Sequence, residues 1–358
     1  MGDPVVLHTL KACGRCTVCA GGQPTRCRSS LGVIDAPFRI GGQPVHQFAN
    51  TSVFVERKRL EMIKGYRVHE QRTPSKPLLV TPSQTIGEVL NCNGALYDKL
   101  LQPFLVAALN TEPKESAASL AAAVMRETLL AGGRNYHPLI AHDGLSAAFV
   151  EPGLKHIEAK GGSVSFGQRV RTLNFDGNRV ASIDVGETIT LAEDDAIILA
   201  VPPVVAASLI PDLTVPTEFR AIVNAHYKIE PPKGLPVITG VVNGLVEWLF
   251  AFDGRLSVTI SNADRLLDPP REELAATIWA DVAKIAGVAA PLPPWQIVRE
   301  RRATFAALPR EDARRPGART KWRNLALAGD WTATGLPATI EGAIRSGNRA
   351  ADLISEPA

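Results

Sequence analysis

Hydrophobic and polar residues change their spacing along the chain, and each change marks a different kind of element. Residues 116–130 are rich in Ala and Leu at helical spacing, and a Gly-Gly pair follows them, which predicts a helix. Residues 163–203 instead alternate or run continuously apolar, which predicts successive strands with a turn at Asp176 and Gly177. The apolar run 196–201 predicts a strand that is buried on both faces.

The second half of the chain shows the same alternation. Residues 234–263 predict strands, residues 272–286 predict a helix, and residues 325–328 predict a short apolar strand. Pro337 then begins a predicted helix whose apolar face is formed by Ile340, Ala343, Ile344, Gly347, Ala351 and Ile354. This order of elements indicates a chain that visits two domains alternately.

Composition narrows the class of protein. Of the 358 residues, 45% are hydrophobic and 21% are charged, as in an ordinary globular protein that is large enough for two domains. The formal net charge is +3, from 39 basic and 36 acidic residues, so we expect no nucleic-acid partner. The sequence shows neither an apolar run long enough to span a bilayer nor signal-peptide features, so we expect a cytoplasmic protein.

The cysteines are concentrated near the N-terminus. Four of the five form the pattern C-x2-C-x2-C-x7-C, namely Cys13, Cys16, Cys19 and Cys27. Four thiolates in a compact loop suit a tetrahedral Zn²⁺ ion, and a closed four-sulfur shell makes such a site structural. The alternative is a flexible loop of unligated thiols.

Residues 5–56 resemble the structural zinc lobe of medium-chain zinc alcohol dehydrogenases. The segment GGQPVHQFANTSVFVE is similar to the part that follows this lobe in that family. The family's catalytic zinc ligands and its nicotinamide-binding domain have no recognisable counterpart in the sequence. Zinc-dependent alcohol dehydrogenase activity therefore stays the weakest of the alternatives.

The end of the chain combines the parts of a cofactor site. A short strand, the acidic residue Asp330 and the start of a helix could hold a polyol and bring a positive dipole end to an electron-rich ring. Gly342 and Gly347 are poor helix formers, which indicates close approach of a backbone or a cofactor. Asp330 could also be a simple helix-capping acid.

The sequence AGDWTATGLPATIEGAIRSG resembles the C-terminal flavin motif of the amine oxidase and phytoene desaturase superfamily. It is most similar to the squalene-associated branch, which includes the hydroxysqualene dehydroxylases, and the similarity runs from about residue 58 to the end. The resemblance implies bound FAD. It assigns FAD contacts to Asp330, Trp331, Thr339, Ile340 and Val170. For Val170, an ordinary place in the core of a strand is the alternative.

The resemblance implies a mixed α/β and α+β fold, a two-domain amine-oxidase-like fold linked to FAD. The N-terminal Rossmann βαβ unit of that family has no counterpart, since no two glycines stand in a G-x-G arrangement. The predicted parts are a zinc lobe at 1–57 and an incomplete FAD-dependent region at 58–358, in which 58–150 and 204–323 are mainly substrate domain and 151–203 and 324–358 mainly FAD domain.

The resemblance implies an FAD-dependent oxidoreductase of squalene and hopanoid metabolism that reduces hydroxysqualene to squalene. The substrate would be a long-chain isoprenoid, with Trp248, Phe250 and Phe104 as candidate walls of an apolar tunnel, and its insolubility implies peripheral association with the inner face of the membrane. The sequence presents no convincing catalytic acid or base. The alternative is an inactive or non-enzymatic fusion with a local zinc site and impaired flavin binding.

Overall fold

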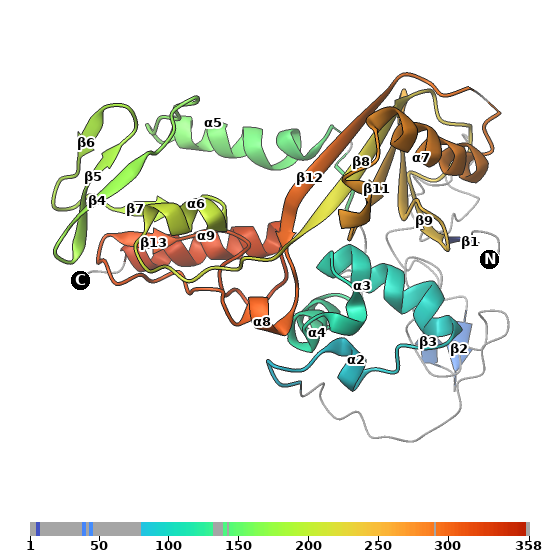
Figure 1. Ribbon diagram of the computed structural model, residues 1–358, viewed down its shortest axis with the longest axis horizontal. Helices are drawn as coiled ribbons and strands as arrows, with labels where there is room; N and C mark the ends of the chain where they lie inside the picture. Colours follow the sequence, from blue (N-terminus) through green and yellow to red (C-terminus); the bar gives the residue numbers. More distant parts are fainter. Residues whose placement is uncertain are drawn as a thin grey trace. The chain divides into compact units, whose positions relative to one another are not determined.

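The computed structural model describes residues 80–131, 139–141, 143–289 and 291–355, together with the backbone of three short strands near the N-terminus. The chain forms two compact units and crosses between them repeatedly (Figure 1). The large unit holds the described parts of Met1–His137, Glu218–Ala313 and Gly335–Ala338. The small unit holds the described parts of Pro138–Thr217, Arg314–Thr334 and Thr339–Ala358.

An antiparallel sheet of six strands forms the centre of the large unit. Its strands, in spatial order, are β1 (Val5–Leu7), β9 (Ile238–Val242), β10 (Trp248–Phe252), β11 (Arg255–Ile260), β8 (Phe219–Lys228) and β12 (Trp295–Phe305). The strands predicted over residues 234–263 are confirmed as β9, β10 and β11.

Helix α7 (Arg271–Ala286) covers one face of this sheet, and it confirms the helix predicted at 272–286. Alternate residues of β8 turn toward it and are fully buried, because a strand presents every second side chain to the same face. Tyr227 shows how the layers are joined: its hydroxyl donates to the carbonyl of Ala275 at 2.8 Å, and its ring lies 5.0 Å from that of Trp279. Each fully buried Val, Leu or Ile in this core contributes roughly 1.5–3 kcal/mol.

Shorter helices accompany the sheet in the large unit. They are α2 (Ile86–Val89), the π-helical turn η4 (Tyr97–Leu101), α3 (Gln102–Leu109), η5 (Pro113–Glu115), α4 (Ala118–Glu127), η7 (Asp264–Leu266) and α8 (Pro309–Asp312). The helix predicted over 116–130 is confirmed as α4. Asn110 ends α3 in the left-handed conformation, and its amide donates to Thr304 at 2.9 Å and accepts from the backbone of Asn262 at 2.7 Å.

The small unit contains a two-stranded parallel sheet, β7 (Ile197–Leu199) beside β13 (Leu325–Leu327), which confirms the predicted strand at 325–328. A separate antiparallel meander has its turn at Gly177 and Asn178, one residue later than the turn predicted at Asp176 and Gly177. The remaining elements are β4 (Thr172–Asp176), β5 (Arg179–Asp184), β6 (Thr188–Thr190), η6 (Ser146–Val150), α5 (Glu151–Ala159), α6 (Pro203–Leu209) and α9 (Ile340–Ser355). Near the N-terminus, β2 (Phe38–Ile40) pairs with β3 (Gln43–Val45).

The prediction that the strand at 196–201 is buried on both faces is wrong. The strand is shorter, and the side chain of Ile198 is 42% exposed. Among the described residues β7 pairs with β13 alone, so a continuous apolar run here does not lie inside a wide sheet.

The predicted apolar face of the last helix is also wrong. Helix α9 buries Gly342, Ser346 and Ala350, whereas Ile340 is 46% and Ile344 is 45% exposed. Small side chains allow the helix to approach β13 closely, and contact with Ala326 in that strand and Ala328 just after it outweighs the burial of larger side chains.

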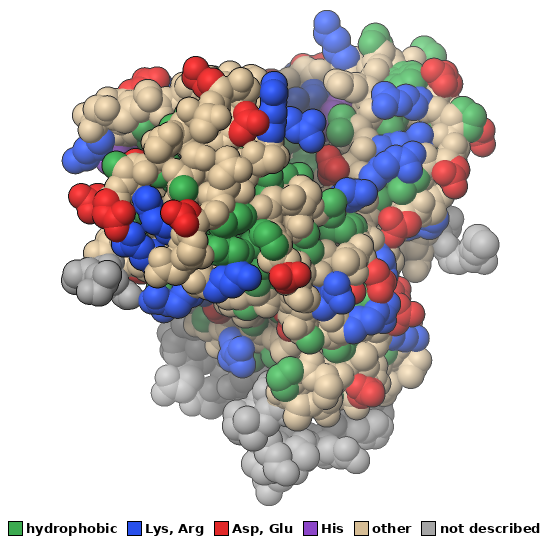
Figure 2. Space-filling model, turned by 60° about the vertical axis from the view of Figure 1, so that its left-hand side comes forward, with side chains coloured by type: hydrophobic (Ala, Val, Ile, Leu, Met, Phe, Trp, Pro, Cys, Tyr) green, Lys and Arg blue, Asp and Glu red, His purple; other side chains and the backbone are tan. Residues whose placement is uncertain are grey.

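Basic and acidic side chains are interspersed on the face shown in Figure 2. None of the described helices is long and apolar enough to cross a membrane.

Candidate functional site

The loop that follows β13 has a conformation fixed by Gly329. Its φ of +139° is rarely adopted by other residues, and a Cβ atom there would lie 2.4 Å from Nε1 of Trp331. The indole of Trp331 is buried, and its N–H donates to the carbonyl of Val201 at 2.9 Å, just beyond β7. The loop is therefore held at the carboxyl ends of both parallel strands, which is where open α/β sheets bind ligands.

Asp330 lies in this loop and is half-buried. Burial raises the pKa of its carboxyl group, and the nearby Arg315 guanidinium and the Trp331 backbone N–H oppose this rise. A carboxylate whose charge is poorly solvated gains most from new hydrogen-bond donors. Asp330 is therefore suited to accepting hydrogen bonds from the hydroxyl groups of a ligand.

Arg315 holds the loop in shape. The buried guanidinium donates to the carbonyl oxygen of Asp330 at 3.2 Å, to the carbonyl oxygen of Thr332, and to the hydroxyl of Thr334 at 3.1 Å. Two of these bonds use backbone oxygens of the loop and the third uses the Thr334 hydroxyl, so they fix the path of the loop without depending on the side chain of Asp330.

The start of α9 provides a second binding element. The Thr339 hydroxyl accepts a hydrogen bond from the Gly342 N–H at 3.0 Å, and the Thr339 carbonyl accepts one from Ala343 at 2.9 Å, so Thr339 caps the helix. The N–H groups of Ile340 and Glu341 belong to the first turn, whose amides have no partner inside a helix. With the positive end of the helix dipole, they are suited to an electron-rich group.

Ser346 ties this helix to the loop. Its hydroxyl accepts from the Gly329 N–H at 2.7 Å and donates to the carbonyl of Ala343 at 2.7 Å. Because the bond to Gly329 joins the helix to the residue directly before Asp330, the carboxylate and the helix are held in one rigid arrangement.

Asn324 joins the meander to the parallel sheet. Its side-chain oxygen accepts from the Val180 N–H at 2.8 Å, and its amide nitrogen donates to the carbonyls of Val180 at 3.0 Å and Asp195 at 3.2 Å. Val170 lies two residues before β4, at the beginning of this meander, and is half-buried. The amide side chain thus connects the region of Val170 to the strand that leads to Asp330.

The five residues predicted to bind FAD lie in one unit of the structure. Asp330 and Trp331 lie in the loop after β13, Thr339 and Ile340 at the start of α9, and Val170 beside the meander, all within the small unit. The indole of Trp331 faces the interior, so that side chain supports the loop. A loop closed by Gly329, a half-buried carboxylate and a helix N-terminus fit the polyol and ring of a flavin.

Asn324, Arg315 and Ser346 were not predicted from the sequence as site residues. Asn324 offered one signal, a polar residue directly before an apolar strand, and the structure shows that its amide is buried there. The bonds of Arg315 and Ser346 depend on backbone positions that no periodicity encodes.

The predicted zinc ligands Cys13, Cys16, Cys19 and Cys27 lie outside the described residues. Among the residues that are described, no group of three or more His, Cys, Asp or Glu side chains could hold a metal ion. The fifth cysteine, Cys92, is buried as a free thiol.

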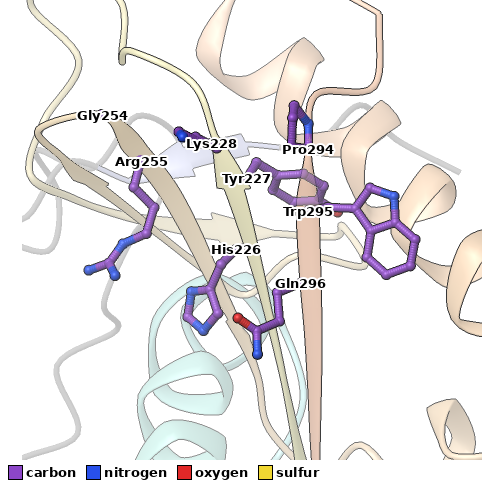
Figure 3. Close-up of a pocket in the computed structure, with 8 residues that line it drawn as sticks. All are labelled: His226, Tyr227, Lys228, Gly254, Arg255, Pro294, Trp295 and Gln296. Atoms are coloured by element: carbon purple, nitrogen blue, oxygen red, sulfur yellow. The ribbon is translucent and has the colours of Figure 1, made fainter.

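A pocket lies in the large unit at one end of the six-stranded sheet. Its volume is about 250 Å³. Figure 3 shows the side chains of His226, Gln296 and Arg255 on one side of the sheet, and those of Tyr227 and Trp295 on the side of α7. The His226 ring nitrogen Nδ1 is 2.9 Å from the hydroxyl oxygen of Ser257. Burial, with a smaller contribution from Arg255, lowers the pKa of His226.

Comparison with known proteins gives the family. The model of the flavin containing amine oxidoreductases matches residues 47–355, so the chain belongs to this family. The family and the amine-oxidase-like fold inferred from the sequence are thereby confirmed, and a flavin is the cofactor of the family.

Curated relatives point to one branch of the family. Hydroxysqualene dehydroxylase from Rhodopseudomonas palustris is 61% identical over 281 residues, which cover 78% of this chain and 67% of that protein. The hydroxysqualene dehydroxylase from Sinorhizobium fredii is 57% identical over 271 residues, 75% of this chain and 65% of that protein. That from Zymomonas mobilis is 47% identical over 277 residues, 77% of this chain and 67% of that protein. The chain thus spans about two thirds of the length of these relatives.

Solved structures agree on the fold. Cyclohexylamine oxidase from Brevibacterium oxydans has a TM-score of 0.55 at 16% identity, over 76% of this chain and 67% of that protein. A protein described as a putative protoporphyrinogen oxidase from Exiguobacterium has a TM-score of 0.51 at 15% identity, over 88% of this chain and 77% of that protein. At such low identity these structures establish the fold alone. The resemblance of residues 5–56 to a zinc lobe has no support from these relatives.

Proposed function

We propose that this protein is an FAD-dependent oxidoreductase of squalene metabolism that reduces hydroxysqualene to squalene. The observation that carries the proposal is the identity of up to 61% with hydroxysqualene dehydroxylases along about two thirds of their length. The loop after β13 and the N-terminus of α9 support it, because both fit a flavin.

We assign the cofactor to the small unit and the isoprenoid to the large unit. Asp330 would accept hydrogen bonds from the ribityl or pyrophosphate part of FAD, and the amides of Thr339 and Ile340 would hold the pyrimidine edge of the ring. The backbone next to Val170 would contact the adenine of FAD. The backbone of Trp331 would form part of the loop that contacts the cofactor. The positive end of the α9 dipole favours a ring that carries extra electron density.

The chemistry itself belongs to the cofactor. Reduced FAD would supply two electrons and, with two protons, allow a carbon–oxygen bond to break, a carbon–hydrogen bond to form, and the hydroxyl to leave as water. The residues of this chain would bind the isoprenoid, orient its hydroxyl and exclude bulk water from the reacting carbon.

Activity of the purified chain tests the proposal. The chain is saturated with FAD, reduced without oxygen and mixed with hydroxysqualene, and squalene is measured by mass spectrometry. We expect squalene from the wild type and from Arg349→Gln, which changes an exposed charge on α9, and none from Asp330→Ala. Folded protein that binds no FAD would instead favour the competing hypothesis of an inactive protein with impaired flavin binding.

We also propose that Cys13, Cys16, Cys19 and Cys27 bind a structural Zn²⁺ ion, on the evidence of their spacing. The measurement is zinc content per chain by atomic emission, for the wild type and for Cys16→Ser. One zinc per chain that is lost in the variant supports the site. Equal zinc in both proteins contradicts it.

Contact with a membrane surface is a third part of the proposal. A water-insoluble substrate has to be taken from lipid, and exposed apolar side chains support such contact, among them Leu139 at 92% and Phe166 at 79% exposure. We expect the chain to float with phospholipid vesicles and Phe166→Ser to float less. Flotation that does not differ between the two proteins counts against a role of this residue.

A further inference from the structure

The two faces of the six-stranded sheet differ in kind. One face is closed by α7 and holds fully buried apolar side chains. The other carries half-buried aromatic and polar side chains on the same strands. Such a mixed, partly exposed face is typical of a ligand site rather than of a core.

The aromatic part of this face lies on β10. Trp248, Phe250 and Phe252 occupy alternate positions, so their side chains share one face of the sheet. The rings of Phe250 and Phe252 are parallel, with an interplanar angle of 1° and a centroid separation of 6.1 Å. A Cβ atom on Gly240 would lie 3.2 Å from the Trp248 ring, so this glycine lets the indole lie against β9. The result is an aromatic strip that suits a long hydrocarbon, with the Arg255 guanidinium over its Phe252 end at 5.1 Å from the ring centroid.

A polar pair lies directly beside this strip. The pairing of strands places Ser257 opposite Phe250 on one side and opposite His226 on the other. The hydroxyl of Ser257 and Nδ1 of His226 are 2.9 Å apart, and His226 also lines the pocket in Figure 3. Among the described residues the next pair along these strands, Asn224 and Thr259, bonds within itself at 2.8 Å.

The state of the histidine determines what it can bind. Burial lowers the pKa of His226, so the ring is neutral at pH 7 and carries one N–H. When the Ser257 hydroxyl donates to Nδ1, that N–H is on Nε2, which is the second hydrogen-bonding atom of the ring. A neutral N–H donor beside an apolar strip matches an alcohol on a hydrocarbon chain.

We propose that His226, oriented by Ser257, binds the hydroxyl group of the isoprenoid substrate while the hydrocarbon lies along Trp248, Phe250 and Phe252. The assignment rests on the proposed function for the identity of the lipid, but it concerns binding and needs no turnover. His226 would make this site distinguish the alcohol from the hydrocarbon product, because the product leaves the donor without a partner.

Equilibrium binding tests the proposal without relying on the flavin reaction. Hydroxysqualene and squalene are each delivered from cyclodextrin, and their affinities for the FAD-saturated chain are compared. We expect the wild type to prefer hydroxysqualene by about 5- to 10-fold, the effect of one hydrogen bond. His226→Leu should lose this preference and bind squalene as tightly as the wild type.

Two further variants separate hydrogen bonding from packing. His226→Gln can place an amide N–H near the position of Nε2 and should keep part of the preference, whereas His226→Asn reaches the position of Nδ1 and should lose it. His156→Leu removes an exposed histidine from α5 and should change neither affinity. If His226→Leu does not fold, the comparison of His226→Gln with His226→Asn tests whether the preference for hydroxysqualene depends on an N–H at the position of Nε2.

Retention of the full preference in folded His226→Leu overturns the inference, as does a wild type that binds both lipids equally or binds neither. A wild type that prefers hydroxysqualene but forms no squalene contradicts the proposed function and leaves the inference standing. A wild type that forms squalene, with an unchanged kcat/KM in His226→Leu, supports the proposed function and contradicts the inference about His226.

Discussion

The large unit and the small unit are each stabilised internally by different kinds of contact. The large unit has a wide apolar core between its sheet and α7, in which residues such as Leu249 and Ile278 are fully buried. In the small unit, the cluster under α9 consists of Ala326, Ala328 and Ala350 with Ile354 partly buried. Hydrogen bonds from Asn324, Arg315 and Ser346 add to the burial of Leu325, Leu327 and Trp331 there.

This difference shows that the candidate FAD-binding region combines close backbone packing with polar side chains that fix a loop. Small side chains let α9 come close to β13, and polar side chains then fix the loop that carries Asp330. Alanines make up the buried cluster under α9, so we expect the small unit to be the less stable and to gain most from a bound ligand. The large unit should hold its shape with or without one.

The largest effect is expected from Ile278→Ala in the core of the large unit. Loss of a fully buried side chain should lower the free energy of unfolding by about 2–5 kcal/mol. The matched control is Ile344→Ala on α9, where the side chain is 45% exposed and the change should stay within about 0.5 kcal/mol. Urea unfolding followed by tryptophan fluorescence measures both, and equal losses would contradict the contrast between the units.

The next largest effect is expected at Gly329. Alanine there would combine a φ of +139° with a contact of 2.4 Å to Trp331, so Gly329→Ala should cost about 2 kcal/mol or more and abolish FAD binding. Gly347→Ala meets no atom within 4 Å in the middle of α9, so it should raise stability by about 0.5–1 kcal/mol. Thermal unfolding with and without FAD distinguishes the two, and tight FAD binding by Gly329→Ala would show that the loop conformation is not needed.

A smaller loss is expected from Asn324→Ala. The variant leaves the buried N–H and carbonyl of Val180 without their partner, at a cost of about 1–3 kcal/mol. Asn174→Ala, which removes an exposed bond to Ser182, is the control and should cost less than about 0.5 kcal/mol. Hydrogen exchange should show faster exchange in the meander of Asn324→Ala, and unchanged protection would mean that Asn324 does not hold it.

The smallest effect on stability is expected from Asp330→Asn, although its effect on the cofactor should be large. Burial raises the pKa of Asp330 in the folded state, so stability falls as the pH rises from the ordinary aspartate pKa through this raised value. Asn is neutral throughout and removes that loss. We expect unfolding at pH 7 to be unchanged or slightly harder while FAD affinity drops about 10-fold or more. A parallel drop in stability would mean that Asp330 is a structural residue.

Much of the fold could be predicted from the sequence where one strong pattern dominates. Helices α4 and α7 and the meander around Gly177 were predicted because their periodicity extends over many residues. The buried face of α9 was predicted wrongly because close packing of small residues overrode hydrophobicity. The burial of Ile198 was predicted wrongly because an apolar run does not reveal how many strands lie beside it. The family motif located Asp330, whereas Asn324, Arg315 and Ser346 act on backbone atoms that only the folded chain brings near.

Flavin content tests the central claim most directly. The purified chain is incubated with FAD, freed of unbound cofactor by gel filtration, and its visible flavin absorbance is compared with its protein concentration. We predict close to one FAD per chain for the wild type and a much lower ratio for Asp330→Ala, with both proteins folded by circular dichroism. A folded wild type that retains no FAD would contradict the claim that the small unit binds this cofactor.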